Sequence, residues 1–252
     1  MSVGDGASSF PPPVVVVHGW GSTYARTWAG SRLEHELERA GRRIIRVDLL
    51  GHGRSRAPHE AAEYAHMADE LATQLPLDTV VDGVGFSLGG KLLLQLACTQ
   101  PHRFGRLVIA GVGDNLFRPE NGAAVAQALY EGLTENTPPV LRPVLAEALA
   151  SGNDRQALAA AIQRPPSLLT PQHLHAIRAQ VLLVVGDRDA IAGPAQQIAA
   201  AIPHLRRTVV EEVDHVSTPH FPQVQALAAG FLHRDPAEND AVSVPSVRRH
   251  PR

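Results

Sequence analysis

Several features that would narrow the function of this 252-residue chain are scarce in it. Cysteine occurs once, at Cys98, so no intrachain disulfide can form, and its place in an apolar pattern predicts a small buried residue. The formal net charge is only -2, which gives no electrostatic basis for binding nucleic acid or an anionic membrane. Lys91 is the single lysine, a bias of composition that indicates nothing about function.

Long apolar runs and known cofactor motifs are also lacking. The start of the chain has no basic n-region, and the first apolar run, residues 14–17, is too short for a signal or membrane helix, so we expect a cytoplasmic protein. There is no G-x-G-x-x-G, no G-K-[ST] phosphate loop and no metal-ligand spacing. We therefore expect neither a cofactor nor a metal.

What remains is an ordinary globular composition, 44% hydrophobic and 19% charged, with apolar runs that alternate between two periods. Short β-branched runs predict strands, and longer segments with helical spacing lie between them. The strands are expected at residues 14–17, 44–47, 79–84, 107–110, 181–185 and 208–213, and helices at 25–40, 61–75 and 91–100. This alternation predicts an α/β fold with a doubly wound, mainly parallel sheet of about six strands.

The predicted sheet is interrupted once. About sixty residues between the fourth and fifth strands are too many for one crossover helix, and they contain helical stretches at 122–133 and 140–150. We expect a helical cap at 113–170, inserted after the fourth strand, over a core formed by 14–112 and 171–233. Residues 1–13 are expected to form an extended arm, and residues 234–252 a disordered tail.

A serine stands at one strand-to-helix turn of the predicted core. The segment 82–90 contains the G-x-S-x-G pattern around Ser87, with Gly85 and Gly89 two residues away on either side. Glycines there let strand and helix pass closely, while the turn exposes the hydroxyl at a helix N-terminus, where negative charge is stabilised. The pattern alone also fits a glycine-rich turn without chemistry, so its neighbours decide.

Together with other loops, this pattern resembles the α/β-hydrolase superfamily over residues 14 to about 233. The matching motifs are His-Gly-Trp-Gly at 18–21, the glycine-rich loop at 48–55, residues 85–89, Gly-Asp-Arg-Asp at 186–189 and His215. Within the superfamily the chain is similar to small lidded carboxylesterases, and the motifs around Trp20 and Ser87 are similar to pimeloyl-carrier methyl-ester esterases. Because few residues precede the first strand, we expect six strands without an opening antiparallel pair.

Chemistry assigns roles to the residues that follow the strands. A serine nucleophile needs a base, and the base needs an acid that orients it. His215 follows the sixth predicted strand, and His220 is its rival. Asp189, which matches the superfamily's acid at the end of its motif, is the expected acid; Asp114, after the fourth strand, is the alternative. His18 and His52 are expected to brace glycine turns, and Asp187 to shape its turn.

The resemblance also implies an oxyanion hole formed by the backbone N–H groups of Leu88 and Trp20. Apolar cap residues predict a pocket for the acyl or alcohol part of the substrate, and Trp20, Phe117, Leu129 and Tyr130 are the expected substrate-binding residues. The alternative is that the cap residues among them only seat the cap on the sheet. The expected partner is a small-molecule ester or acyl substrate, either free or bound to a carrier. We therefore predict a serine esterase; a thioesterase, a lactonase, a carbon–carbon bond hydrolase or a ligand sensor with little turnover would use the same triad.

Overall fold

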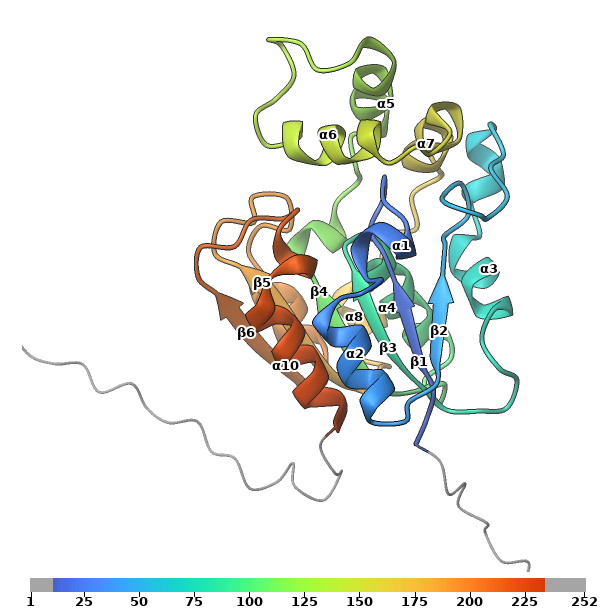
Figure 1. The fold of residues 1–252 in the computed structure, drawn as a ribbon, viewed down its shortest axis with the longest axis vertical. Helices are drawn as coiled ribbons and strands as arrows, with labels where there is room; N and C mark the ends of the chain where they lie inside the picture. Colours follow the sequence, from blue (N-terminus) through green and yellow to red (C-terminus); the bar gives the residue numbers. More distant parts are fainter. Residues whose placement is uncertain (1–10, 234–252) are drawn as a thin grey trace, which may run out of the picture.

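A single parallel sheet forms the centre of the protein (Figure 1). The computed structural model describes residues 11–233. Its six strands follow the order β2-β1-β3-β4-β5-β6 and all pair in parallel, as the sequence predicted. They are β1 Val14–Val17, β2 Ile44–Val47, β3 Val81–Phe86, β4 Phe104–Ala110, β5 Gln180–Gly186 and β6 Leu205–Val210. Most of the predicted N-terminal arm and the whole tail, residues 234–252, lie outside the described residues.

Helices cover both faces of the sheet. The helices α2 (Arg32–Arg39) and α10 (Pro222–His233) lie on one face, where Val14 and Val16 point. The other face carries α3 (Met67–Thr73), α4 (Leu88–Thr99), α8 (Pro171–Leu174) and α9 (Gln196–Ala201), packed on Val15 and Val17. All four valines of β1 are fully buried or nearly so, which explains why this strand reads as a continuous β-branched run.

Two helices predicted as continuous are interrupted. Residues 25–40 form α1 (Tyr24–Thr27) and α2, because Gly30 adopts φ +70° and the Ser31 hydroxyl then caps α2 by accepting from the Glu34 N–H. Residues 61–75 form the 3-10 turn η1 (Ala61–Tyr64) and α3. Local helical periodicity does not report such breaks, since the same apolar spacing continues across them.

A helical insert follows β4, as predicted. It begins with the 3-10 turn η2 (Asp114–Phe117) and continues with α5 (Gly122–Glu131), α6 (Arg142–Ala150) and α7 (Arg155–Ile162). Figure 1 shows α5, α6 and α7 standing off the carboxyl ends of the strands. They share a small apolar core of their own. The sequence did not single out α7, which starts where Asp154 accepts hydrogen bonds from the backbone N–H groups of Gln156 and Ala157.

The strand order reverses at β1. Val17 at the carboxyl end of β1 pairs with Val47 of β2 on one side and with Gly85 of β3 on the other. The loops that follow β1 and β3 therefore diverge at neighbouring points of one edge, which is where open α/β sheets bind ligands. Among the described residues, no helix is long and apolar enough to cross a membrane.

Candidate active site

Ser87 occupies the tight turn between β3 and α4. Its backbone adopts φ +49° and ψ -115°, a strained conformation for a residue with a side chain. Its N–H donates to the carbonyl of Ala110 at the end of β4, at 2.9 Å. A Cβ placed on Gly85 would lie 2.6 Å from the Gly90 Cα, and one on Gly89 would lie 2.6 Å from the His18 carbonyl oxygen. The two flanking positions thus admit glycine alone without displacing the backbone.

Two side chains from distant loops reach Ser87 in series. The Ser87 Oγ and the His215 Nε2 are 3.0 Å apart, and the His215 Nδ1 lies 2.9 Å and 3.0 Å from the two oxygens of Asp189. Since a carboxylate only accepts, Nδ1 carries the proton and the Nε2 lone pair faces the serine hydroxyl. The Phe86 ring packs against the imidazole, with centroids 5.0 Å apart.

The position of Asp189 depends on the loop after β5. Its Oδ1 accepts from the backbone N–H groups of Ile191 and Ala192 at 3.1 Å and 2.8 Å, and its side chain is completely buried. Asp187 accepts from the Val213 N–H and so shapes the turn, as expected. Backbone donors therefore hold the Asp189 carboxylate in place in addition to its contact with His215.

The two alternative residues, Asp114 as acid and His220 as base, are placed differently from Asp189 and His215. The Asp114 Oδ1 accepts from the Ile198 N–H at 3.1 Å, in the first turn of α9, so this buried carboxylate serves a helix N-terminus. His220 lies on the 3-10 turn η3 (Thr218–His220), exposed at the edge of the cavity that contains Ser87. The hydrogen bonds to Ser87 and Asp189 come from His215.

The loop after β1 lies directly beside Ser87. A Cβ on Gly19 would be 3.3 Å from the Ser87 Cβ, and Trp20 lines the same cavity as Ser87. The Trp20 indole Nε1 donates to the carbonyl of Leu158 in α7, at 3.0 Å. Leu88 is the first residue of α4, where backbone N–H groups have no acceptor within the helix. Both predicted oxyanion-hole residues therefore flank the serine.

Comparison with protein families decides the class. Residues 14–229 match the model of the alpha/beta hydrolase family. The chain belongs to this family.

The relatives of this alpha/beta hydrolase include esterases and carbon–carbon bond hydrolases. It is 40% identical over 114 residues to the pimeloyl-[acyl-carrier protein] methyl ester esterase of Aromatoleum aromaticum, covering 45% of this chain and 42% of the relative. It is 43% identical over 105 residues to the 2-hydroxy-6-oxo-2,4-heptadienoate hydrolase of Pseudomonas putida, covering 39% and 37%. The chain thus spans less than half the length of these two relatives.

Solved structures agree with the family. A thermophilic esterase from Thermogutta terrifontis superposes with a TM-score of 0.67 at 24% identity, covering 88% of this chain and 91% of that one. The enol-lactonase of Burkholderia xenovorans gives a TM-score of 0.66 at 21% identity, covering 91% and 95%. At these identities the likeness shows the fold.

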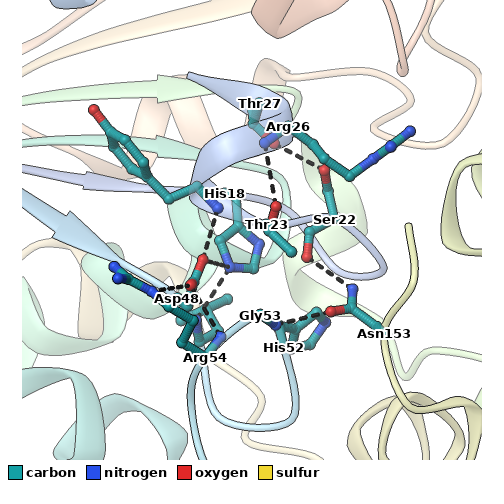
Figure 2. Close-up of polar contacts among 12 residues, drawn as sticks. His18, Ser22, Thr23, Arg26, Thr27, Asp48, His52, Gly53, Arg54 and Asn153 are labelled. Carbon is teal, nitrogen blue, oxygen red and sulfur yellow. Dashed lines mark hydrogen bonds and ion pairs between the residues drawn. The ribbon is translucent and has the colours of Figure 1, made fainter. Parts of the chain in front are cut away.

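Two buried imidazoles brace the loops of this alpha/beta hydrolase (Figure 2). His18 accepts the Leu49 N–H on Nε2, so its Nδ1 donates to the Gly19 carbonyl. His52 accepts the Gly21 N–H on Nε2 and donates from Nδ1 to the Leu50 carbonyl. Burial lowers the pKa of His18 to about 4 and that of His52 to about 3, and the neighbouring His18 contributes to the second shift. Both rings are therefore neutral, and they brace the glycine turns as the sequence predicted.

Asp48 and Asn153 complete this network, and the sequence signalled neither role. Asp48 accepts from the N–H groups of Tyr24 and Arg54. Asn153, in the turn between α6 and α7, donates to the carbonyls of Gly21 and Ser22 and accepts from the Gly53 N–H at 2.8 Å (Figure 2). One cap side chain therefore bonds to the loops after both β1 and β2.

A cavity of about 320 Å³ lies between Ser87 and the cap. Its apolar wall comes from Val125, Leu141, Val144, Leu145 and Ile162. Of the residues predicted to bind substrate, Trp20 lines it, but the structure does not bring the other three there.

Helix packing explains the difference. Leu129 is fully buried within the cap because α5 turns that face toward α6 and α7, whereas Tyr130 is 58% exposed and Phe117 packs against the sheet core. Residues on the inner face of α6, in the first half of α5 and at the end of α7 line the cavity in their place. Among residues 11–233, no group of three or more metal-ligating side chains is arranged to hold a metal ion.

Proposed function

We propose that the protein is a serine hydrolase that cleaves a carboxylic ester through an acyl-enzyme intermediate, with Ser87 as nucleophile, His215 as general base and acid, and Asp189 as orienting acid. The observation that carries this proposal is the hydrogen-bonded series from the Ser87 hydroxyl through both ring nitrogens of His215 to Asp189. Its geometry is that required for general-base activation of a serine.

In the first half-reaction, the Ser87 Oγ attacks the ester carbonyl while its proton passes to the His215 Nε2. The resulting imidazolium is stabilised by Asp189 through the hydrogen bond to Nδ1. The tetrahedral intermediate carries an oxyanion, for which we propose the N–H groups of Leu88 and Trp20 as donors. Collapse of the intermediate transfers the proton from Nε2 to the departing alkoxide, and the acyl group stays on Oγ.

In the second half-reaction, water replaces the alcohol. His215 Nε2 takes a proton from the water as its oxygen attacks the acyl carbonyl, and the same oxyanion donors serve the second intermediate. Collapse then breaks the bond between the carbonyl and Oγ, and the proton on Nε2 returns to Ser87. The free acid is released and the serine is regenerated.

A carboxylic ester is favoured by the largely apolar wall near Ser87 and by the names of the esterase relatives. A carrier-bound acyl substrate is part of the proposal because the name of the relative from Aromatoleum aromaticum describes such a substrate. Carbon–carbon bond cleavage is the second candidate, since the Pseudomonas putida relative is named as a dienoate hydrolase. A screen of aryl esters of increasing acyl length, alongside a thioester, a lactone and a vinylogous diketone, separates these reactions.

The nucleophile itself is tested by labelling. A fluorophosphonate probe is expected to label the wild-type protein, and Ser87→Ala is expected to lose both labelling and multiple turnover of a short aryl ester. Ser55→Ala is the matched control, because Ser55 lies on the loop after β2 and does not line the cavity. Labelling or comparable turnover of the Ser87→Ala protein would contradict the proposal, and labelling without turnover would favour a ligand sensor.

A further inference from the structure

One wall of the cavity that holds Ser87 is charged, although the rest is mainly apolar. Four side chains form this wall: Lys91, Arg118, Glu120 and Arg164. All four also line an adjoining cavity of about 330 Å³ between α4 and the ends of the cap. The charged wall thus separates the two cavities and faces both.

Two of its cations share one carboxylate. The Lys91 Nζ donates to the Glu120 Oε1 at 2.8 Å, and the Arg164 Nη2 donates to the Glu120 Oε2 at 2.9 Å. The side chains of Lys91 and Arg164 are only 14% and 15% exposed. Burial alone would raise the pKa of Glu120, but the two cations outweigh it and hold the pKa of this carboxyl below its usual range. Glu120 is therefore an anion between two largely buried cations.

The wall has more positive charge than Glu120 can neutralise. An ammonium has three donors, and among the described residues Lys91 spends one, on Glu120. The Arg118 guanidinium, exposed at the cavity edge, makes no hydrogen bond or ion pair with any residue in 11–233. Three cations of the wall therefore accompany one carboxylate, and donors on Lys91 and Arg118 have no partner among the described residues. The one other carboxylate on the lining, Glu147, is bound by Arg26 through two hydrogen bonds.

The place of Lys91 in the chain relates this charge to the reaction. Lys91 lies four residues after Ser87 on α4, which corresponds to about 6 Å along the helix axis. A group bound by the charged wall would thus lie a short distance from the carbonyl attacked by Ser87. This spacing suits a small substrate with a reactive ester at one end and an anion at the other.

We propose that the charged wall binds a carboxylate of the substrate, remote from the ester, so that the preferred substrates are short esters that carry an ionised carboxylate, such as monoesters of dicarboxylic acids. This inference rests on the proposed function and names the substrate class of the same site. Arg118 and Lys91 supply the donors to the bound carboxylate, and Arg164 keeps Glu120 in place. Cationic donors recognise such a group strongly because hydrogen bonds between charged partners are shorter and stronger than those between neutral groups.

A purely structural role makes a different prediction. Glu120 lies on the segment that enters the cap and Arg164 on the segment that leaves it, so the same ion pairs could serve only to tie the cap to α4. In that case, removing the charge of Glu120 would loosen the cap and impair all substrates alike. If the wall binds a carboxylate, the same change removes a competing anion and improves anionic substrates selectively.

The kinetic test compares two probes of equal chain length, monomethyl adipate, which is anionic at pH 7, and methyl hexanoate, which is neutral. Arg118→Gln is expected to raise KM for monomethyl adipate by about 10- to 100-fold, as for the loss of one hydrogen bond to a charged group, and to leave methyl hexanoate unchanged. Glu120→Gln is expected to lower KM for monomethyl adipate alone. Arg39→Gln and Glu38→Gln on α2, outside the cavity lining, are the matched controls.

A binding measurement separates this inference from the proposed function. Adipate is titrated into the Ser87→Ala protein by calorimetry, with and without Arg118→Gln. Adipate binding that depends on Arg118 supports the subsite even if the wild type hydrolyses neither ester, an outcome that would refute the esterase proposal alone. The opposite outcome is hydrolysis that depends on Ser87, equal responses of both esters to the Arg118 and Glu120 variants, and no binding of adipate. That outcome would overturn the carboxylate subsite and leave the esterase proposal standing.

Discussion

Mild acid is expected to destabilise the protein through His18 and His52, the two imidazoles that brace the loops beside Ser87. Both are buried, and their pKa values of about 4 and about 3 lie below the ordinary 6.5. Below pH 6.5 the unfolded chain therefore takes up protons that the folded protein excludes. Their stabilising contribution is fully present above pH 6.5 and is lost progressively as the pH falls toward the folded-state values.

The size of the effect follows from the shifts. Each pH unit below 6.5 removes about 1.4 kcal/mol per excluded proton, so each imidazole lowers the free energy of unfolding by about 2 kcal/mol between pH 7 and pH 5. The two together remove about 4 kcal/mol, a large part of the roughly 5–15 kcal/mol that stabilises a typical domain. Carboxylates contribute little in this interval, because most are ionised in both states.

Urea unfolding followed by tryptophan fluorescence at pH 7, 6 and 5 measures this loss. His52→Gln keeps an oxygen that can accept the Gly21 N–H but cannot be protonated, so the decrease between pH 7 and pH 5 should be about halved. His35→Gln, an exposed position on α2, should retain the full decrease. A free energy of unfolding that stays constant from pH 7 to 5, or an unchanged slope in His52→Gln, would refute the assignment of neutral braces.

Four other substitutions test the site and the residues that support it. Asp189→Asn is expected to lower kcat by up to about ten-thousandfold, because it removes the acid that orients His215. Asp114→Asn weakens the hydrogen bond to the first turn of α9 and should mainly lower the melting temperature. If steady-state kinetics show Asp114→Asn as the severe variant and Asp189→Asn as the mild one, the acid is Asp114. Gly89→Ala places a Cβ 2.6 Å from the His18 carbonyl oxygen, so a large fall in melting temperature is expected, and wild-type stability would show that the backbone yields there. Leu145→Ala shortens a side chain of the cavity wall, so the enlarged cavity should shift the preferred acyl length upward in an ester series. Equal losses of activity for all acyl lengths would indicate a structural role alone.

Residues that directly follow predicted strands were placed well by sequence reasoning. Hydrophobic runs located the strands, and parallel strands bring their carboxyl ends to one edge, so Ser87, Asp189 and His215 were expected near one another and lie within hydrogen-bonding distance. Their catalytic roles stay predictions.

The cap was harder to anticipate, because its contacts depend on how three helices rotate against each other. Leu129 and Tyr130 are neighbours in sequence, yet one is buried and the other is more than half exposed. Asn153 stands in an unremarkable turn, and its bonds to two core loops arise only once the cap is docked. Tertiary packing decides such contacts, and periodicity along one chain does not contain it.

The chain enters and leaves the cap helices at almost the same point in space. A Cβ on Gly122, the first residue of α5, would come within 2.2 Å of the carbonyl oxygen of Ile162, the last residue of α7. The two ends of this segment are therefore as close together as the ends of a tight loop. Lengthening the segment between them adds little to the entropic cost of closing that loop. The strands therefore tolerate changes in the length and sequence of residues 122–162, and libraries that vary this segment to search for new substrates should keep Asn153, which bonds the cap to the loops after β1 and β2.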